Sequence, residues 1–374
     1  MIERLLLDWI HGEATRAAIR GEHDFIVFAG AHEAEAALPF AELAGARTQL
    51  ADNPPVVELA PIVGLYSRGE HQATRDTMRM TGRADKHDDA ALTTVGWCSQ
   101  SGSVTVRPPA VAGSFYPADP QALRAVVREH LGMAREHFAP SDPWPKALIV
   151  PHAGYMYSGP VAANAFVLLE RSRGVVQRIL ILGPSHHIPF EGLAVPSSTD
   201  FETPLGRVPI DESARELLLA LPFAHVLDDA HHWEHSLEVQ LPFLQEVLGT
   251  FTVLPIAIGR AAPEQVARAL EALWGGDETV IVISSDLSHY HDYDTAKRMD
   301  AATAGAIEAL EPERLGHEDA CGRIGVQGLL EAAQRHSLVA NTLDLRSSGD
   351  TAGGRDEVVG YGAWAFTVSK NGSP

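Results

Sequence analysis

Hydrophobic residues fall into short continuous runs that alternate with helical patterns from residue 146 to the end of the chain. Three runs, at 147–150, 179–182 and 280–285, have the length and β-branched composition of strands buried on both faces. A final strand is expected at 358–368. Strands that alternate with helices predict an α/β fold, a three-layer α/β/α domain with a central, mostly parallel sheet.

Each of the three buried runs is followed by a histidine. His152 follows the first run, His186 and His187 follow the second, and Asp286 and His289 follow the third. Because the carboxyl ends of parallel strands meet at one edge of a sheet, we expect these side chains to converge. Only one of two adjacent histidines usually points toward a site, which favours His186 as a ligand and leaves His187 as its neighbour.

Residues 1–105 differ from the rest of the chain. The segment from Ser67 to Asp89 is rich in Arg, Thr, His and Asp and has little periodicity, so it has few apolar side chains to bury. Two interpretations stay open: a small accessory region, or an extension that is poorly ordered or lies upstream of the true start. We expect the α/β domain to span residues 106–370.

Composition narrows the classes of partner. The 374 residues are 45% hydrophobic, as in a soluble globular protein, and carry a formal net charge of -20. That charge argues against nonspecific binding to nucleic acid or to an anionic membrane. Two distant cysteines provide no disulfide framework, and no apolar run approaches the roughly 20 residues that span a bilayer. We therefore expect a cytoplasmic protein.

A segment at 231–249 offers further polar candidates. Ser236 is a plausible N-cap for a helix with Glu238 in its first turn. His235 or Glu238 then lies beside the site, or the segment is a cap with a surface histidine cluster; both interpretations stay open. Tyr155 follows His152 closely enough to line the same pocket.

Histidines at strand ends, with acids and one thiol, suffice for a mononuclear metal site. Two imidazoles and one anionic ligand on iron(II) leave positions for substrate and dioxygen. A hydrolytic zinc site uses similar parts with a bound water. Cys321, just before a predicted helix, is either a small buried residue or a thiolate that ligates the metal.

Seven motifs resemble the Memo family, whose bacterial and archaeal members are known as protein B of the AmmeMemoRadiSam system. They are RPPAVAGSFYP, PHAGYMYSG, LGPSHH, EHSLEVQLPFL, SSDLSHY, ACGRIG and GDTAGGRDEVVGYGAWAF. The resemblance runs from about Arg107 to the C-terminal strand. It implies the fold of class III extradiol dioxygenases, the LigB type, and a functional link to a radical SAM enzyme and an AMMECR1-like protein.

The resemblance also implies residue roles. His152 and His186 match the two histidine ligands of iron(II), and His289 matches the acid/base histidine. Cys321 matches the cysteine that Memo proteins carry in place of the glutamate ligand. A thiolate changes the electronics of the iron and opens the site to copper or zinc, so ring cleavage is not implied.

These observations lead to one principal hypothesis and two alternatives. The principal one is an iron(II)-dependent redox enzyme, with unknown substrate, in which Asp286 orients His289 or a bound water. The ligands are then His152, His186 and Cys321, and the pocket is lined by Tyr155, His187 and His235. The alternatives are a binding module for a peptide or protein partner, and a thiol or zinc hydrolase that acts through Cys321 and His289.

Overall fold

The computed structural model describes residues 18–20, 25–27, 104–139 and 143–368. The chain divides into two compact units, Thr15–Gly102 and a larger unit of Ser103–Pro374 with Met1–Ala14. In the smaller unit, β1 (Ala18–Arg20) pairs antiparallel with β2 (Phe25–Val27). Apart from these two strands and residues 104–105, the predicted accessory region or extension, including Ser67 to Asp89, lies outside the described residues.

A nine-stranded sheet organises the described part of the larger unit, in the order β12-β14-β4-β11-β5-β10-β6-β9, with β13 paired to β14. The four central strands are parallel: β4 (Ala147–Val150), β11 (Thr279–Ser284), β5 (Arg178–Pro184) and β10 (Thr252–Ile258). The flanking strands are β12 (His289–His291), β13 (Leu338–Ser347), β14 (Val358–Val368), β6 (Leu193–Val195) and β9 (Ala224–Val226). Of these, β14 is antiparallel to β4, β12 and β13, and β6 is antiparallel to β10.

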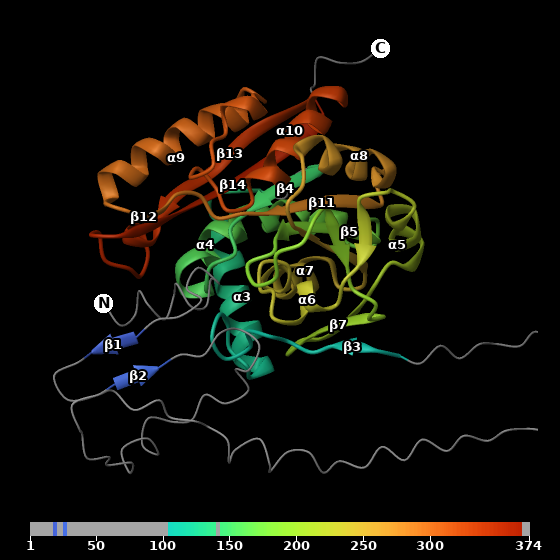
Figure 1. The fold of residues 1–374 in the computed structure, drawn as a ribbon, viewed down its shortest axis with the longest axis horizontal. Helices are drawn as coiled ribbons and strands as arrows, with labels where there is room; N and C mark the ends of the chain where they lie inside the picture. The colour runs from blue at the N-terminus through green and yellow to red at the C-terminus, as the bar shows by residue number, and fades with distance from the viewer. Residues whose placement is uncertain (1–17, 21–24, 28–103, 140–142, 369–374) are drawn as a thin grey trace, which may run out of the picture. The chain divides into compact units, whose positions relative to one another are not determined.

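Helices cover both faces of this sheet (Figure 1). One layer contains α3 (Pro120–Arg135), α4 (Tyr155–Phe166), the 3-10 turn η2 (Val167–Ser172) and α7 (Leu241–Leu248). The other contains α5 (Glu212–Leu219), α8 (Pro263–Leu273), α9 (Tyr293–Glu308) and α10 (Arg323–Arg335). The three-layer α/β/α prediction is therefore confirmed.

Shorter elements complete the described fold. A separate three-stranded sheet joins β3 (Val106–Arg107), β7 (Asp200–Thr203) and β8 (Gly206–Pro209). The remaining turns are α6 (Asp229–His232), η3 (Glu238–Gln240), η4 (Pro312–Arg314) and η5 (Ser348–Asp350).

The strands that were predicted to be buried have almost no contact with solvent. Every residue of β4, residues 179–182 of β5 and residues 280–283 of β11 have an exposed fraction of 0%. Burying one such aliphatic side chain contributes about 1.5–3 kcal/mol. The buried packing of the three strands therefore fixes the positions of their carboxyl ends and of the residues that follow.

Candidate metal centre

The loops after β4, β5 and β11 converge at one edge of the sheet. His152 follows β4 and His186 follows β5, and their rings meet edge to face with centroids 5.2 Å apart. Cys321 approaches from the segment before α10, and its Sγ lies 3.3 Å from His152 Nε2. The candidate ligand atoms of these three residues all lie within 4.8 Å of one another. The structure thus brings the three predicted ligands together.

Close backbone packing places Cys321 at this edge. Its N–H donates to the Asp286 carbonyl at 3.3 Å, and the N–H of Gly322 donates to Ser285 Oγ at 2.9 Å. A Cβ atom on Gly322 would lie only 2.7 Å from the Ser284 carbonyl oxygen. Only glycine lets the chain pass so close to the end of β11.

A buried hydrogen-bond network fixes the tautomer of His152. Ser284 Oγ donates its one hydrogen to the Ser236 carbonyl at 2.6 Å and accepts from Gln240 Nε2 at 2.9 Å. Toward His152 Nδ1, 2.9 Å away, the hydroxyl can therefore only accept, so Nδ1 carries the proton. Nε2 faces Cys321 as a result, which is how outer partners orient a metal-binding imidazole.

Glu234 orients His186 in the same way. Its Oε1 lies 2.9 Å from His186 Nδ1, and its Oε2 accepts the His186 backbone N–H at 2.6 Å. Oε1 also accepts the backbone N–H groups of His235 and Ser236. Burial alone would raise the pKa of Glu234, but the neighbouring imidazoles and these donors hold it well below its ordinary value. A buried carboxylate is thus aimed at Nδ1, which leaves His186 Nε2 to interact with Cys321.

Charge at the centre favours a thiolate. Burial raises the pKa of the Cys321 thiol, but His152 and His186 more than offset this and lower it to about 6. Burial lowers the pKa of His186, while Glu234 and Cys321 raise it well above its ordinary value. Both shifts favour a thiolate that faces a protonated imidazole. A metal cation can take the place of the proton between the sulfur and the ring nitrogen.

Asp286 joins two of the loops. Its Oδ1 accepts the His152 backbone N–H at 2.7 Å, so it ties the end of β4 to the segment after β11. Burial raises the pKa of this carboxyl, although the His289 imidazole and the donated N–H oppose the shift. His289 begins β12, half-buried, within electrostatic reach of Asp286.

The three predicted pocket residues lie in different surroundings. The His235 ring stacks on the His186 ring with centroids 4.6 Å apart, and the centroid of the His187 ring lies 6.2 Å from that of His235. Burial lowers the pKa of His235 well below its ordinary value despite the nearby Glu234, so this imidazole is neutral. Tyr155 is buried in α4, where its hydroxyl donates to the Val239 carbonyl at 2.6 Å.

The predicted helix cap at Ser236 is wrong. The helix α7 begins at Leu241, and Ser236 Oγ instead donates to the Pro184 carbonyl at 3.1 Å. Glu238 lies in the short turn η3, fully buried, and forms an ion pair with Arg107. The Arg107 guanidinium also donates to the carbonyls of His231 and Glu234. Glu238 therefore anchors the segment that carries Glu234 and His235.

Sequence reasoning missed both Glu234 and Ser284. Glu234 is flanked by His232 and Trp233 on one side and His235 on the other, a polar setting that resembles an exposed loop. Ser284 ends an apolar strand and resembles an ordinary strand terminus. The available signal for Glu234 was that His235, a predicted site residue, follows it directly in the sequence.

For a metal held by the predicted ligands, we expect replacement of Ser284 with alanine to weaken binding by about 10–100-fold, the usual effect of losing an outer partner of a metal-binding histidine. The change removes the acceptor that fixes His152 Nδ1–H. Competition with a chelator of known affinity measures the loss. Ser172→Ala is the control, because Ser172 is equally buried and bonds only locally to Leu169 in η2. Equal affinities in the two variants would contradict this assignment of the tautomer.

The helices within the described ranges do not combine the length and the apolar character needed to span a bilayer.

Comparison with known proteins gives a consistent result over most of the chain. The model of the family described as Memo-like protein matches residues 107–365. A MEMO1 family protein of Aquifex aeolicus is 37% identical over 268 residues, which cover 68% of this chain and 97% of that protein. A MEMO1 family protein of Sulfolobus acidocaldarius is 35% identical over 277 residues, with coverages of 68% and 97%. A third relative, from Thermotoga petrophila, is 37% identical over 274 residues. The chain therefore belongs to the Memo-like protein family.

Proposed function

We propose that this protein binds one transition-metal ion through His152 Nε2, His186 Nε2 and Cys321 Sγ and acts as a metal-dependent oxidoreductase of the nonheme-iron type. The observation that carries the proposal is the pair of buried acceptors, Ser284 and Glu234, each of which takes up the Nδ1–H of one histidine. Both Nε2 atoms are thereby directed toward the same sulfur. Histidines that bind a metal almost always donate their second ring N–H to a partner of this kind.

Iron(II) is our first candidate for the metal, with copper or zinc as alternatives. Two imidazoles and a thiolate suit all three ions, and the family resemblance favours iron. Iron(II) held by three protein ligands supplies open coordination positions at which a substrate and dioxygen bind together. The donor atoms present fit this group, since they lie within 4.8 Å of one another and come from buried or half-buried side chains.

The remaining residues are suited to handle protons. His235 stays neutral beside His186, so its imidazole offers one hydrogen-bond donor and one acceptor near the centre. His289 is the proposed acid/base group, and the buried Asp286 acts on it electrostatically. Asp286 also holds the His152 loop in place through the backbone, so its role includes positioning.

An anaerobic titration of metal-free protein with iron(II) tests the proposal. We expect saturation near one ion per chain, followed by dioxygen consumption when catechols or quinols are supplied. If iron(II) binds but no dioxygen is consumed, the proposed metal site stands. The proposed oxidation of catechols and quinols is then rejected. Failure to bind iron(II), copper or zinc stoichiometrically would overturn the proposal as a whole.

A second candidate, thiol chemistry, is favoured by one observation. Cys321 Sγ and His152 Nε2 lie 3.3 Å apart, and the pKa of the thiol is about 6, as in a nucleophile paired with a base. In this case the metal-free protein is the active form and hydrolyses an activated ester.

Alkylation of Cys321 distinguishes the two candidates. In metal-free protein, the thiolate fraction rises as the pH passes upward through about 6, so the rate of labelling by iodoacetamide will rise over the same range. Saturation with the metal will suppress labelling, because the sulfur is then coordinated. Mass spectrometry of the peptide that contains Cys321 provides the measurement. Labelling that the metal does not change would contradict ligation by Cys321.

A further inference from the structure

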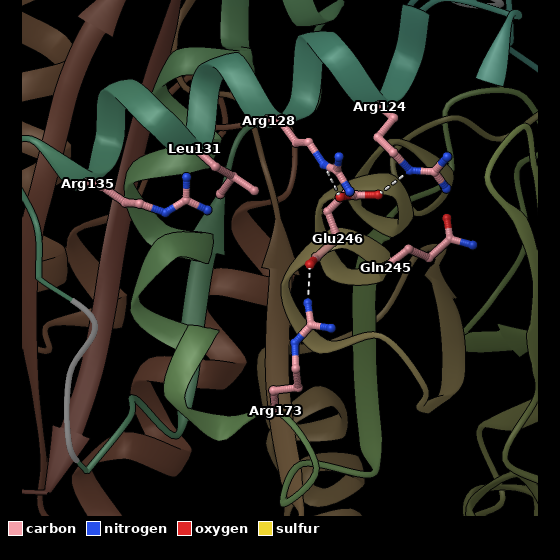
Figure 2. Close-up of a pocket in the computed structure, with 7 residues that line it drawn as sticks. All are labelled: Arg124, Arg128, Leu131, Arg135, Arg173, Gln245 and Glu246. Carbon is pink, nitrogen blue, oxygen red and sulfur yellow. Dashed lines mark hydrogen bonds and ion pairs between the residues drawn. The ribbon is translucent and has the colours of Figure 1, made fainter. Parts of the chain in front are cut away.

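Four arginines line a hollow on the α3 side of the sheet, although the chain as a whole is acidic (Figure 2). Its volume is about 710 Å³, within the range of ligand sites. The lining consists of Arg124, Arg128, Leu131 and Arg135 from α3, Arg173 from the turn after η2, and Gln245 and Glu246 from α7. The three arginines of α3 lie at intervals of four and seven residues, which places them along one face of the helix.

Internal contacts hold the guanidinium groups in place. Arg124 Nε donates to one carboxylate oxygen of Glu246 at 2.7 Å, and Arg128 Nε donates to the other at 2.8 Å. Because these bonds use Nε, the two terminal nitrogens of each side chain stay available to a ligand. Arg173 donates Nε to the Val247 carbonyl at 3.0 Å and also bonds the Glu246 carbonyl, so the last turn of α7 fixes it.

The local charge is positive. Four guanidinium groups face only two acidic partners among the described residues, Glu246 and Glu170, and Glu170 pairs with Arg135 at 2.5 Å. Burial raises the pKa of Glu246, but Arg128 and Arg124 hold it below its ordinary value, as expected beside an excess of cations. Such an excess is notable in a chain of net charge -20.

The chemistry of the lining defines the class of ligand. Arginine presents paired donors that match the oxygens of phosphate groups. Among the described residues that line the hollow, Leu131 is the one apolar side chain and none is aromatic, so this lining offers no surface on which a nucleobase would stack. The best fit is a compact, multiply charged anion without an aromatic part.

The hollow lies away from the proposed metal centre. Arg173 precedes β5, and Glu246 lies in the last turn before β10, so both belong to the amino-terminal ends of parallel strands. The proposed ligands His152 and His186 follow the carboxyl ends of β4 and β5. The two sites are therefore at opposite edges of the sheet.

We propose that this arginine hollow is a binding site for a small inorganic polyphosphate, a diphosphate or triphosphate chain whose oxygens bridge the guanidinium groups of Arg124, Arg128 and Arg173. The site is independent of metal binding. It adds a second ligand class to the protein.

Calorimetric titration of the full-length protein with sodium pyrophosphate and with tripolyphosphate tests the proposal. We expect saturable binding of one anion per chain, tighter for tripolyphosphate, that weakens as the salt concentration rises. The double variant R124Q/R128Q will lose at least about tenfold in affinity, because two charged hydrogen-bonding groups are removed. Arg260→Gln is the matched control, because Arg260 is an exposed arginine paired with Glu191 outside the hollow.

A third variant, His186→Ala, locates the anion. Unchanged affinity in this variant, together with loss in R124Q/R128Q, supports the proposed site. Loss of binding in His186→Ala with retention in R124Q/R128Q would place the anion at the metal centre and overturn the proposal. Absence of saturable binding at millimolar concentrations, or an equal loss in Arg260→Gln, would also overturn it.

Discussion

Protein in which His186 is replaced by alanine will retain no stoichiometric metal, whereas the His187→Ala protein will retain about one ion per chain. The expected loss in affinity exceeds the roughly 10–100-fold that removal of an outer partner causes, because a proposed ligand itself is removed. The physical reason is the different surroundings of two adjacent imidazoles. His186 is held by Glu234 at Nδ1 and interacts with Cys321, while the ring centroid of His187 lies 6.2 Å from that of His235.

Elemental analysis of protein purified without chelator, together with iron(II) titration under anaerobic conditions, measures this difference. Far-ultraviolet circular dichroism of both variants controls for folding, since each substitution is confined to a loop at the sheet edge. Metal retained by the His186→Ala protein would remove His186 from the ligand set. Loss of metal from both variants would mean that the loop as a whole, and not one imidazole, governs binding.

The second large effect concerns the stability of the fold and not the binding of a metal. Replacing Glu238 with glutamine will lower the free energy of unfolding by about 3–5 kcal/mol, the range observed when one partner of a buried ion pair is removed. The Glu238 carboxylate is fully buried and accepts from Arg107, from the Tyr116 hydroxyl and from the backbone N–H of Ala110. Glutamine preserves the shape but leaves the guanidinium charge of Arg107 without a counter-charge.

Urea denaturation, read as the change in midpoint at constant slope, provides the measurement. Glu191→Gln is the control, because Glu191 pairs with Arg260 on the surface, where such a pair contributes less than about 1 kcal/mol. Combining Glu238→Gln with Arg107→Met should restore part of the loss, since no buried charge is then left uncompensated. A Glu238→Gln protein of normal stability that binds less metal would instead assign Glu238 to the site itself.

Local sequence patterns were sufficient for the part of the fold that depends on hydrophobic runs. The segments 147–150 and 179–182 were predicted as buried strands and lie within β4 and β5, and the final strand at 358–368 is β14. Such runs are informative because a strand covered on both faces must be apolar throughout. The convergence of His152 and His186 followed from the same reasoning, since parallel strands end at one edge.

Family resemblance, and not periodicity, drew attention to Cys321 as a ligand. A cysteine before a helix is equally consistent with simple burial. Its place beside His152 depends on the packing of α10 against β11 and on Gly322, contacts between segments about 37 residues apart.

The sequence by itself determined the class of the fold and the histidines at the strand ends, because both depend on residues that are neighbours along the chain. Only the tertiary structure decided the roles of Glu234 and Ser284, the burial of Glu238 against Arg107, and the gathering of arginines around Glu246. These contacts join segments 48 to 132 residues apart. A polar side chain looks the same in sequence whether it faces water or a buried partner, and only packing selects between the two.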